Sequence, residues 1–378
     1  MNNRIRKFFC ITATALACVS TFGSCSFLSG ILKDSSQEDV YMAVRTLTPL
    51  SQKTVSIANA EVSAFAKDYK VGAANQFNTG KDHFTMRGLQ LTWEADNAPN
   101  SYTVCLSESN DLSNAAVYET TDTQLHIDDL FVNTNYYWQV TAHYDGGDEQ
   151  SKIERFITAN TPRTLDIDGV SNTRDLGGKN LATGQFRQGM VYRGGKLDNI
   201  TEKGKASARD VYGIKTDLDL RNMQEGTAGG VSPLGEDIRY VHVNESPYYL
   251  GGTTGIDVSK NQSIIAKSIK VFADKSNYPI YVHCSLGRDR TAAVCMLLEG
   301  LLGVSEDDIK MDYEMSFFSE MGYLDGQTVD RMMSVFTSMC QYISLQTRGD
   351  FKEDCEKYLL DAGVTAEEIA SIRSILTK

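Results

Sequence analysis

The sequence predicts a multidomain chain in which an all-β sandwich is followed by an α/β domain. The length of 378 residues suits two domains better than one, and a hydrophobic content of 41% is enough for packed cores. Short alternating runs separated by turn residues fill the first half, as in antiparallel strands. In the second half strands alternate with helical segments, which is typical of an α/β domain with a mainly parallel sheet.

The N-terminus has the pattern of an export signal, because three basic residues precede an uncharged apolar or small stretch over residues 8–22. The following Gly23-Ser24-Cys25 resembles a bacterial lipoprotein cleavage box, which implies cleavage before Cys25 and lipid on that residue. We expect a lipoprotein signal peptide over residues 1–24 and a polar tether over residues 25–44. The protein is then exported and lipid-anchored to a bacterial cell envelope membrane, facing the periplasm or the surface. An ordinary cleaved signal, or acylation at Cys18, is the alternative.

The chain is acidic, with a formal net charge of −12. Removing the three signal-peptide cations leaves 34 Lys and Arg against 49 Asp and Glu, a net charge of −15. Such a chain is a poor general binder of nucleic acid, so no nucleic-acid partner is expected. Any site for an anion must be local.

Cysteine usage also restricts the function. Of eight cysteines, three lie in the signal and acylation region, which leaves five, an odd number. Their spacing fits neither a disulfide scaffold nor a zinc site, so no metal is expected. Cys340 and Cys355 could pair, and the sequence leaves this open, whereas Cys284 is expected to be free.

Residues 45–162 are expected to form the β-sandwich. Alternating runs occur around Trp93, over residues 102–106 and over residues 136–142, with turn residues between them. An early tryptophan, and a leucine six residues before Tyr136, resemble a fibronectin type III or immunoglobulin-like module over residues 89–159. The resemblance implies a spacer or a docking module for a protein or glycan partner, with its aromatic residues in the core.

The α/β domain is expected over residues 163–378. It opens on residues 169–178, where paired glycines after Arg174-Asp175 suit a tight turn. A threonine-capped helix is expected over residues 201–211. Further strands are expected near residues 213–221 and 239–243, and a helix precedes the strand at residues 279–282. Beyond it the chain is mostly helical, with a capping box at Thr365 and Glu368.

The run from His283 to Thr291 carries the residues suited to catalysis. Within it, we call residues 284–290 the cysteine loop. It lies between the apolar strand at residues 279–282 and an apolar helix at residues 291–302. Backbone N–H groups at a helix N-terminus can cradle a phosphate and lower the pKa of Cys284, giving a thiolate. Arg290 can clamp two phosphate oxygens, and Thr291 can donate a hydrogen bond to the sulfur. A buried core cysteine is the plainer interpretation, which the glycine and the arginine disfavour.

Together these residues resemble the bacterial tyrosine phosphatase family that opens on N-F-R-D-L-G-G and has the loop H-C-x-x-G-K-D-R-T-G. The resemblance covers residues 169–376 and includes the D-L-R run at residues 219–221, with Glu225 after it, and the C-terminal run at residues 358–365. Three positions depart from the family pattern: Thr173, Arg288 and Ala292. None of these changes removes a catalytic group.

The resemblance implies that Cys284 is the nucleophile and Arg290 the phosphate clamp, with no cofactor. Phosphate-binding positions are Ser285, Leu286, Gly287, Arg288 and Thr291. The general acid is expected to be Asp289, inside the loop, with Glu245 as the other candidate. Asp175 and Asp219 are expected to be structural, tied to Arg174 or Arg221.

The predicted function is therefore that of an exported cysteine-dependent protein tyrosine phosphatase that works through a phosphocysteine intermediate. Its partner is a phosphotyrosyl protein or another phosphate ester. A phosphoinositide or inositol-phosphate phosphatase is the alternative within enzymes, because Arg288 and Asp289 suit polyphosphorylated substrates. A catalytically inert surface binding protein and a sulfur transferase are the remaining alternatives.

Overall fold

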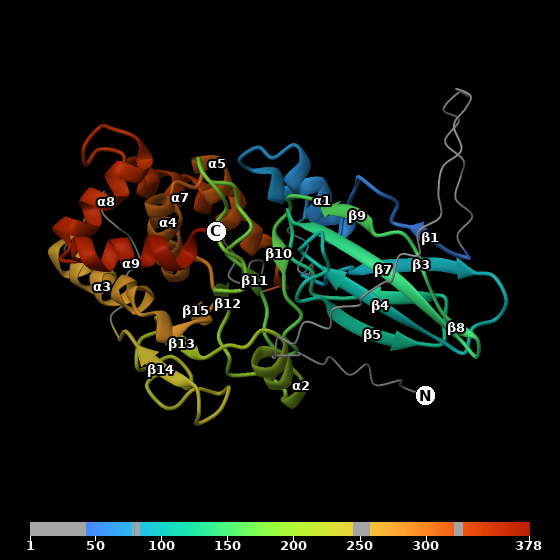
Figure 1. The fold of residues 1–378 in the computed structure, drawn as a ribbon. Helices are drawn as coiled ribbons and strands as arrows, with labels where there is room; N and C mark the ends of the chain where they lie inside the picture. The colour runs from blue at the N-terminus through green and yellow to red at the C-terminus, as the bar shows by residue number, and fades with distance from the viewer. Residues whose placement is uncertain (1–42, 78, 80–83, 245–257, 321–327) are drawn as a thin grey trace, which may run out of the picture. The chain divides into compact units, whose positions relative to one another are not determined.

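The computed structural model describes residues 43–77, 79, 84–244, 258–320 and 328–378, which form two compact units (Figure 1). The first unit comprises residues 43–55 with Gln90–Ile127 and Asn135–Ile157. The second comprises Ser56–Leu89, Asp128–Thr134 and Thr158–Lys378. The division differs from the predicted boundary at residue 162, because Ser56–Leu89 and Asp128–Thr134 group with the second unit. The predicted signal peptide, Cys25 and nearly all of the tether lie outside the described residues.

The first unit is built from two antiparallel sheets. One has the strand order β1-β3-β6, and the other has the order β2-β9-β7-β4-β5, with β8 paired to β7. The strands are β1 (Val44–Thr48), β2 (Lys53–Val55), β3 (Leu89–Ala95), β4 (Ser101–Ser107), β5 (Ala116–Thr120), β6 (Gln124–Ile127), β7 (Asn135–Tyr144), β8 (Gly147–Gln150) and β9 (Glu154–Thr158).

Side chains that are alternately buried and less buried along the chain are typical of such strands. Along β7, Tyr136, Trp138, Val140 and Ala142 are buried and the residues between them are not, as expected for a strand with one face in a core. The rings of Trp93 in β3 and Tyr102 in β4 meet edge to face with centroids 5.5 Å apart, so the two sheets share a core. The resemblance to a fibronectin type III module stays a prediction.

The second unit contains a six-stranded sheet of order β10-β11-β12-β15-β13-β14. The strands are β10 (Arg163–Thr164), β11 (Arg174–Asp175), β12 (Val191–Gly194), β13 (Thr216–Asp219), β14 (Arg239–His242) and β15 (Ile280–His283). Strands β12, β15, β13 and β14 are parallel, and β10 and β11 add an antiparallel edge. The predicted α/β domain with a mainly parallel sheet is confirmed.

Helices cover both faces of this sheet. They are α1 (Ala60–Lys67), η1 (Ala73–Gln76), α2 (Glu202–Ala206), η2 (Ser207–Val211), α3 (Val258–Lys270), η3 (Val271–Ala273), η4 (Lys275–Asn277), α4 (Asp289–Leu302), α5 (Glu306–Glu314), η5 (Met315–Phe318), α7 (Val329–Ile343), α8 (Phe351–Asp361) and α9 (Ala366–Leu376). The predicted cap at Thr201 and the capping box at Thr365 and Glu368 are both present.

Alternating residues of the central strands enter different cores. In β15, Ile280 and Val282 join the large core around α4, whereas Tyr281 joins a smaller cluster with Tyr192 and Tyr212 on the other face. Helix α4 is buried along its whole length apart from its first residue, because the sheet and the other helices surround it. The loop between β15 and α4 is therefore fixed at both ends by core elements.

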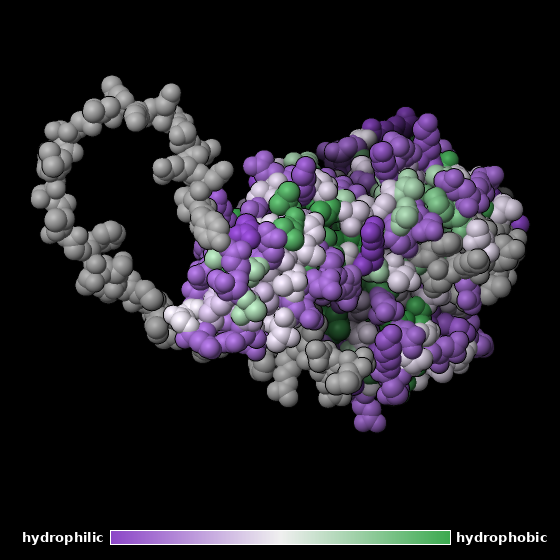
Figure 2. Space-filling model, turned by 90° about the vertical axis from the view of Figure 1, so that its right-hand side faces the viewer, coloured by the Kyte–Doolittle hydropathy of each residue, from purple (hydrophilic) through white to green (hydrophobic). Residues whose placement is uncertain are grey.

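Five free cysteines lie in the described part of the chain: Cys105, Cys284, Cys295, Cys340 and Cys355. The pairing of Cys340 with Cys355 that the sequence left open is absent, and the Cys340 sulfur instead lies 3.4 Å from the Met296 sulfur. No helix among the described residues combines the length and apolar character needed to span a bilayer. On the face shown in Figure 2, hydrophilic side chains predominate and hydrophobic ones are scattered between them.

Candidate functional site

The candidate site is built on the turn from β15 into α4. Strand β15 ends at the buried His283, and α4 begins at Asp289, so residues 284–288 must turn tightly between them. Gly287 makes this turn with φ of +68°, and a Cβ added there would overlap the carbonyl group of Gly194. Only glycine avoids both the strained dihedral and this close backbone approach.

Cys284 lies at the base of this turn with 2% of its surface exposed. Burial by itself opposes ionisation of the thiol. The positive charge of Arg290 and the neighbouring polar groups of Thr291 outweigh it, so the pKa of Cys284 is below its ordinary value. Cys284 thus has the electrostatic surroundings of a nucleophilic thiolate.

Among the described residues, three backbone donors of the cysteine loop are left without an acceptor. In the described part of the chain, the N–H groups of Ser285, Leu286 and Gly287 donate to no acceptor. Unpaired buried N–H groups are costly unless an external acceptor binds them, and the α4 N-terminus adds its positive dipole. The loop is therefore suited to an anion with several acceptor oxygens.

Arg290 is buried and paired with Glu225, which follows β13. Its terminal nitrogens donate to both Glu225 oxygens at 2.6 and 2.8 Å, and the Ser285 hydroxyl also donates to this carboxylate. Hydrogen bonds from Arg290 and Ser285 outweigh desolvation and lower the pKa of Glu225 to about 2. Glu225 holds the guanidinium on the cysteine loop, as expected for a positioned phosphate clamp.

Asp289 is the first residue of α4, and its carboxylate is bound from two sides. Arg288 donates to both of its oxygens at 3.1 Å, and the buried Tyr313 hydroxyl donates to Oδ1 at 2.8 Å. The Arg288 guanidinium also lies 5.3 Å above the Phe317 ring centroid. The other candidate acid, Glu245, lies outside the described residues.

Side chains of residues 169–178, which we call the opening motif, and of β12 hold the cysteine loop. The Asn172 amide donates to the Leu286 carbonyl at 2.8 Å, and Arg174 donates to the Asn172 side chain at 2.6 Å. Arg193 of β12 donates to the Gly287 carbonyl at 2.8 Å. Together these side chains fix two consecutive carbonyl groups of the loop and help to turn its N–H groups toward the opposite side.

Asp312 of α5 joins the two arginines. One of its oxygens accepts from Arg174 at 2.8 Å and the other from Arg193. Burial disfavours its charge, but these two cations hold the pKa of Asp312 well below its usual range. Local sequence reasoning missed Asp312, Arg193 and Tyr313, because no motif marks them and they reach the loop from distant elements.

The acidic residues that were predicted to be structural have defined partners. Asp219 pairs with Arg221 at 2.8 Å, as expected. Asp175 pairs with Arg163 at 2.9 Å and not with Arg174. Asp217 lies 2.9 Å from His283 Nε2; although burial opposes the charge, this carboxylate raises the pKa of His283.

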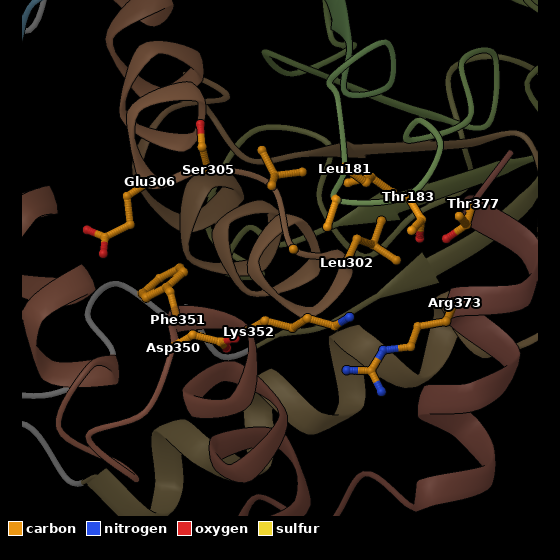
Figure 3. A pocket seen from close by; sticks show the side chains of 13 residues that line it. Leu181, Thr183, Leu302, Ser305, Glu306, Asp350, Phe351, Lys352, Arg373 and Thr377 are labelled. Carbon is orange, nitrogen blue, oxygen red and sulfur yellow. The ribbon is translucent and has the colours of Figure 1, made fainter.

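A cavity of about 450 Å³ is separate from this site. It is lined by the C-terminal end of α4 around Leu302, the start of α8 around Phe351, and Arg373 of α9 (Figure 3). Since α4 has 14 residues, this cavity lies about 20 Å from the cysteine loop. Among the described residues, no cluster of three or more His, Cys, Asp or Glu side chains could hold a metal ion.

A strand, a tight loop with a low-pKa cysteine, and a helix that carries a clamping arginine define a cysteine-dependent hydrolase of phosphate esters. Comparison with known proteins agrees: residues 165–378 match the model of the tyrosine phosphatase family, so the chain belongs to that family. A "putative tyrosine-protein phosphatase" of Cupriavidus necator is 28% identical over 178 residues, which is 39% of this chain and 61% of that protein. The chain thus spans less than two thirds of this relative.

Two solved structures also match part of the chain. Both are of the catalytic core of Siw14, one of them described as a PP-IP phosphatase from S. cerevisiae in complex with citrate. Each is 16% identical to this chain and covers 39% of it, with 86% and 87% of the other chain covered. The TM-scores are 0.25 and 0.26.

Proposed function

We propose that this chain is a protein tyrosine phosphatase that hydrolyses phosphotyrosyl esters through a phosphocysteine intermediate. The observation that carries the proposal is the buried Cys284, whose pKa is lowered by Arg290 and Thr291 beside a loop of unpaired N–H groups. Family membership supports the reaction class. The phosphotyrosyl substrate goes beyond that membership and is part of the proposal.

In the first step the Cys284 thiolate attacks phosphorus in line with the leaving oxygen. The S–P bond forms, the P–O bond of the ester breaks, and the leaving oxygen takes a proton from an acid. The loop N–H groups and Arg290 bind the three remaining phosphate oxygens throughout. In the second step water attacks phosphorus and gives a proton back to the carboxylate that the acid has become, the S–P bond breaks, and the thiolate and inorganic phosphate are released.

Asp289 is our proposed acid for the leaving oxygen. It lies within the loop, and Arg288 and Tyr313 hold its carboxyl group in one orientation. The buried Thr291 hydroxyl has no hydrogen-bond partner among the described residues, and we propose that it donates to the sulfur and favours its departure from phosphorus. Glu245 is the second candidate acid, on the sequence argument alone.

Phosphoinositide or inositol-phosphate hydrolysis is the second candidate activity. The argument for it was the cationic Arg288, but this side chain is buried and bound to Asp289 and Phe317. The neighbouring carboxylates of Glu225, Asp198 and Asp289 are each paired with an arginine and offset its positive charge. This arrangement favours a substrate with a single phosphate group over a polyanion.

The proposal includes export and a lipid anchor at Cys25. The support is the sequence pattern, which consists of a basic start, an uncharged apolar stretch and Gly23-Ser24-Cys25. The β-strand unit would then be a spacer, or a docking module for a protein or glycan at the envelope. Radiolabelled palmitate incorporation in the wild type but not in Cys25→Ala tests the anchor.

A substrate panel tests the activity. Purified reduced protein is assayed with a chelator on a phosphotyrosyl peptide, a phosphoseryl peptide, a phosphoinositide and an inositol phosphate, beside Cys284→Ser. We expect the highest kcat/KM on the phosphotyrosyl peptide and no turnover by the variant. Preference for the phosphoinositide would replace the proposed substrate. Absence of turnover on every ester would favour an inert binding protein.

A further inference from the structure

The segment Ser56–Leu89 lies outside the matched family region, residues 165–378, yet it packs within the phosphatase unit. In the sequence it precedes most of the β-strand unit. It carries α1 and η1, and it reaches α5, η5 and the opening motif through polar and aromatic contacts. We call its described residues, 56–77, 79 and 84–89, the brace.

The polar contact is made by Glu314, the last residue of α5, which is fully buried. Its carboxylate accepts from the Tyr69 hydroxyl at 2.8 Å, the Gly72 N–H at 3.0 Å and the Ala74 N–H at 2.6 Å. All three donors belong to the brace. A buried carboxylate needs such donors, so the end of α5 and the brace must be ordered together.

An aromatic cluster continues this contact into η5. Phe65 and Phe77 of the brace lie 4.8 and 4.6 Å from the Phe318 ring, centroid to centroid. The neighbouring Phe317 lies beneath the guanidinium of Arg288, a residue of the cysteine loop. In η5, Phe318 thus contacts the brace, and the adjacent Phe317 contacts the cysteine loop.

A second contact reaches the opening motif. The ring of Phe84, which is buried, lies 5.9 Å from the Arg174 guanidinium carbon. Arg174 in turn holds Asn172, which donates to the Leu286 carbonyl of the loop. Arg174 also binds Asp312, the carboxylate shared with Arg193. Phe84 therefore packs on Arg174, which binds both Asn172, the residue that holds the Leu286 carbonyl, and Asp312.

We propose that the brace is a positioning element for the cysteine loop, and that Phe84 and Phe77 are positioning residues that act through Arg174 and η5. This inference rests on the proposed function, because it assumes that the loop binds phosphate. Without the brace rings, Arg174 and η5 can shift, and the loop carbonyls that they fix can turn. A cradle displaced by a fraction of an ångström stabilises both the thiolate and the transition state less well.

The test uses the full chain with the variants Phe84→Leu and Phe77→Leu, which keep apolar volume but remove a ring. Phe351→Leu is the matched control, because Phe351 lies at the distant cavity beside the other end of α4 (Figure 3). Three quantities are measured for each: the midpoint of thermal unfolding, kcat and KM for p-nitrophenyl phosphate, and the pH dependence of iodoacetamide alkylation of Cys284. Alkylation reports the thiol pKa without any turnover.

We expect both brace variants to raise the apparent pKa of Cys284 and to lower kcat by about tenfold to a hundredfold, with a smaller change in KM. The control should lose thermal stability with an unchanged alkylation profile. If the brace variants match the control in all three quantities, the brace only stabilises the fold and the inference is wrong. If the wild type hydrolyses no ester, the proposed function fails, while the alkylation profiles still decide whether the brace positions the loop.

Discussion

Arg290 donates from both terminal nitrogens to the two carboxylate oxygens of Glu225, a residue 65 positions earlier in the chain. The pair joins the start of α4 to the segment after β13, two elements that are adjacent only in the folded protein. The fork geometry fixes the plane of the guanidinium. The arginine is therefore held in one orientation beside Cys284 before a substrate arrives.

Replacing Glu225 by Gln should release this arginine. We expect kcat/KM to fall by roughly tenfold to a hundredfold, because the clamp is no longer held in place. The pair also makes stability depend on pH. The pKa of Glu225 is about 2 in the folded protein against 4.5 ordinarily, so its stabilisation is present above pH 4.5 and is lost as the pH falls toward 2.

Urea unfolding of the wild type and Glu225→Gln at a series of pH values measures this. The difference in unfolding free energy should be largest above pH 4.5 and should shrink at lower pH. A difference that is independent of pH would show that the ion pair does not stabilise the fold.

Replacing Gly287 by Ala tests the geometry of the loop. The dihedral alone should cost about 1–2 kcal/mol, and the overlap with the Gly194 carbonyl should add to this and distort the loop. Gly363→Ala is the matched control, because its φ is +95° and a Cβ there meets nothing within 4 Å. We expect both variants to be less stable and only Gly287→Ala to lose phosphatase activity. Equal activities would mean that the loop tolerates a shifted backbone.

Asp289 is tested by leaving-group dependence. If its carboxyl group protonates the leaving oxygen, Asp289→Asn should lower kcat by roughly a hundredfold to ten-thousandfold for phenyl phosphate. The loss should be small for a dinitrophenyl ester, whose oxygen needs no proton. The same pair of esters applied to Glu245→Gln compares the two candidates. Equal losses for both esters in Asp289→Asn would exclude Asp289 as the acid and assign it to holding Arg288.

Asp312 should be essential to the fold of the site. Asp312→Asn leaves two buried arginines short of a counter-charge, and we expect about 3–5 kcal/mol of destabilisation with loss of activity. Asp354→Asn is the control, since among the described residues this buried aspartate accepts hydrogen bonds only from Thr347. It should cost about 1–3 kcal/mol and leave kcat unchanged. Similar kinetics in the two variants would contradict the role given to Asp312.

The features that could be predicted from the sequence are those determined by residues close together in the chain. The run from His283 to Thr291 is nine consecutive residues between an apolar strand and an apolar helix, so the flanking elements of the cysteine loop were identified correctly. The glycine at position 287 and the cap at Thr365 also follow from local backbone requirements. The parallel sheet followed from alternation of strands and helices along the chain.

What depends on long-range packing was not predictable in this way. Asp312 and Tyr313 lie on α5, an ordinary amphipathic helix in the sequence, and only the fold brings them to the loop. Asp175 was expected to be tied to Arg174 or Arg221, but β-strand geometry directs the side chains of Arg174 and Asp175 to opposite faces, and Asp175 pairs with Arg163. Ser56–Leu89 was assigned to the β-sandwich, because nothing in its composition marks a preference for the second unit.

The most direct test of the account is to trap the covalent intermediate. Wild type, Asp289→Asn and Cys284→Ser are mixed with a phosphate ester, quenched with acid within milliseconds and digested, and the peptide that carries residue 284 is analysed by mass spectrometry. We predict a phosphoryl group on Cys284 in the first two proteins and none in the serine variant. Turnover of the ester without any phosphoryl group on Cys284 would contradict the account.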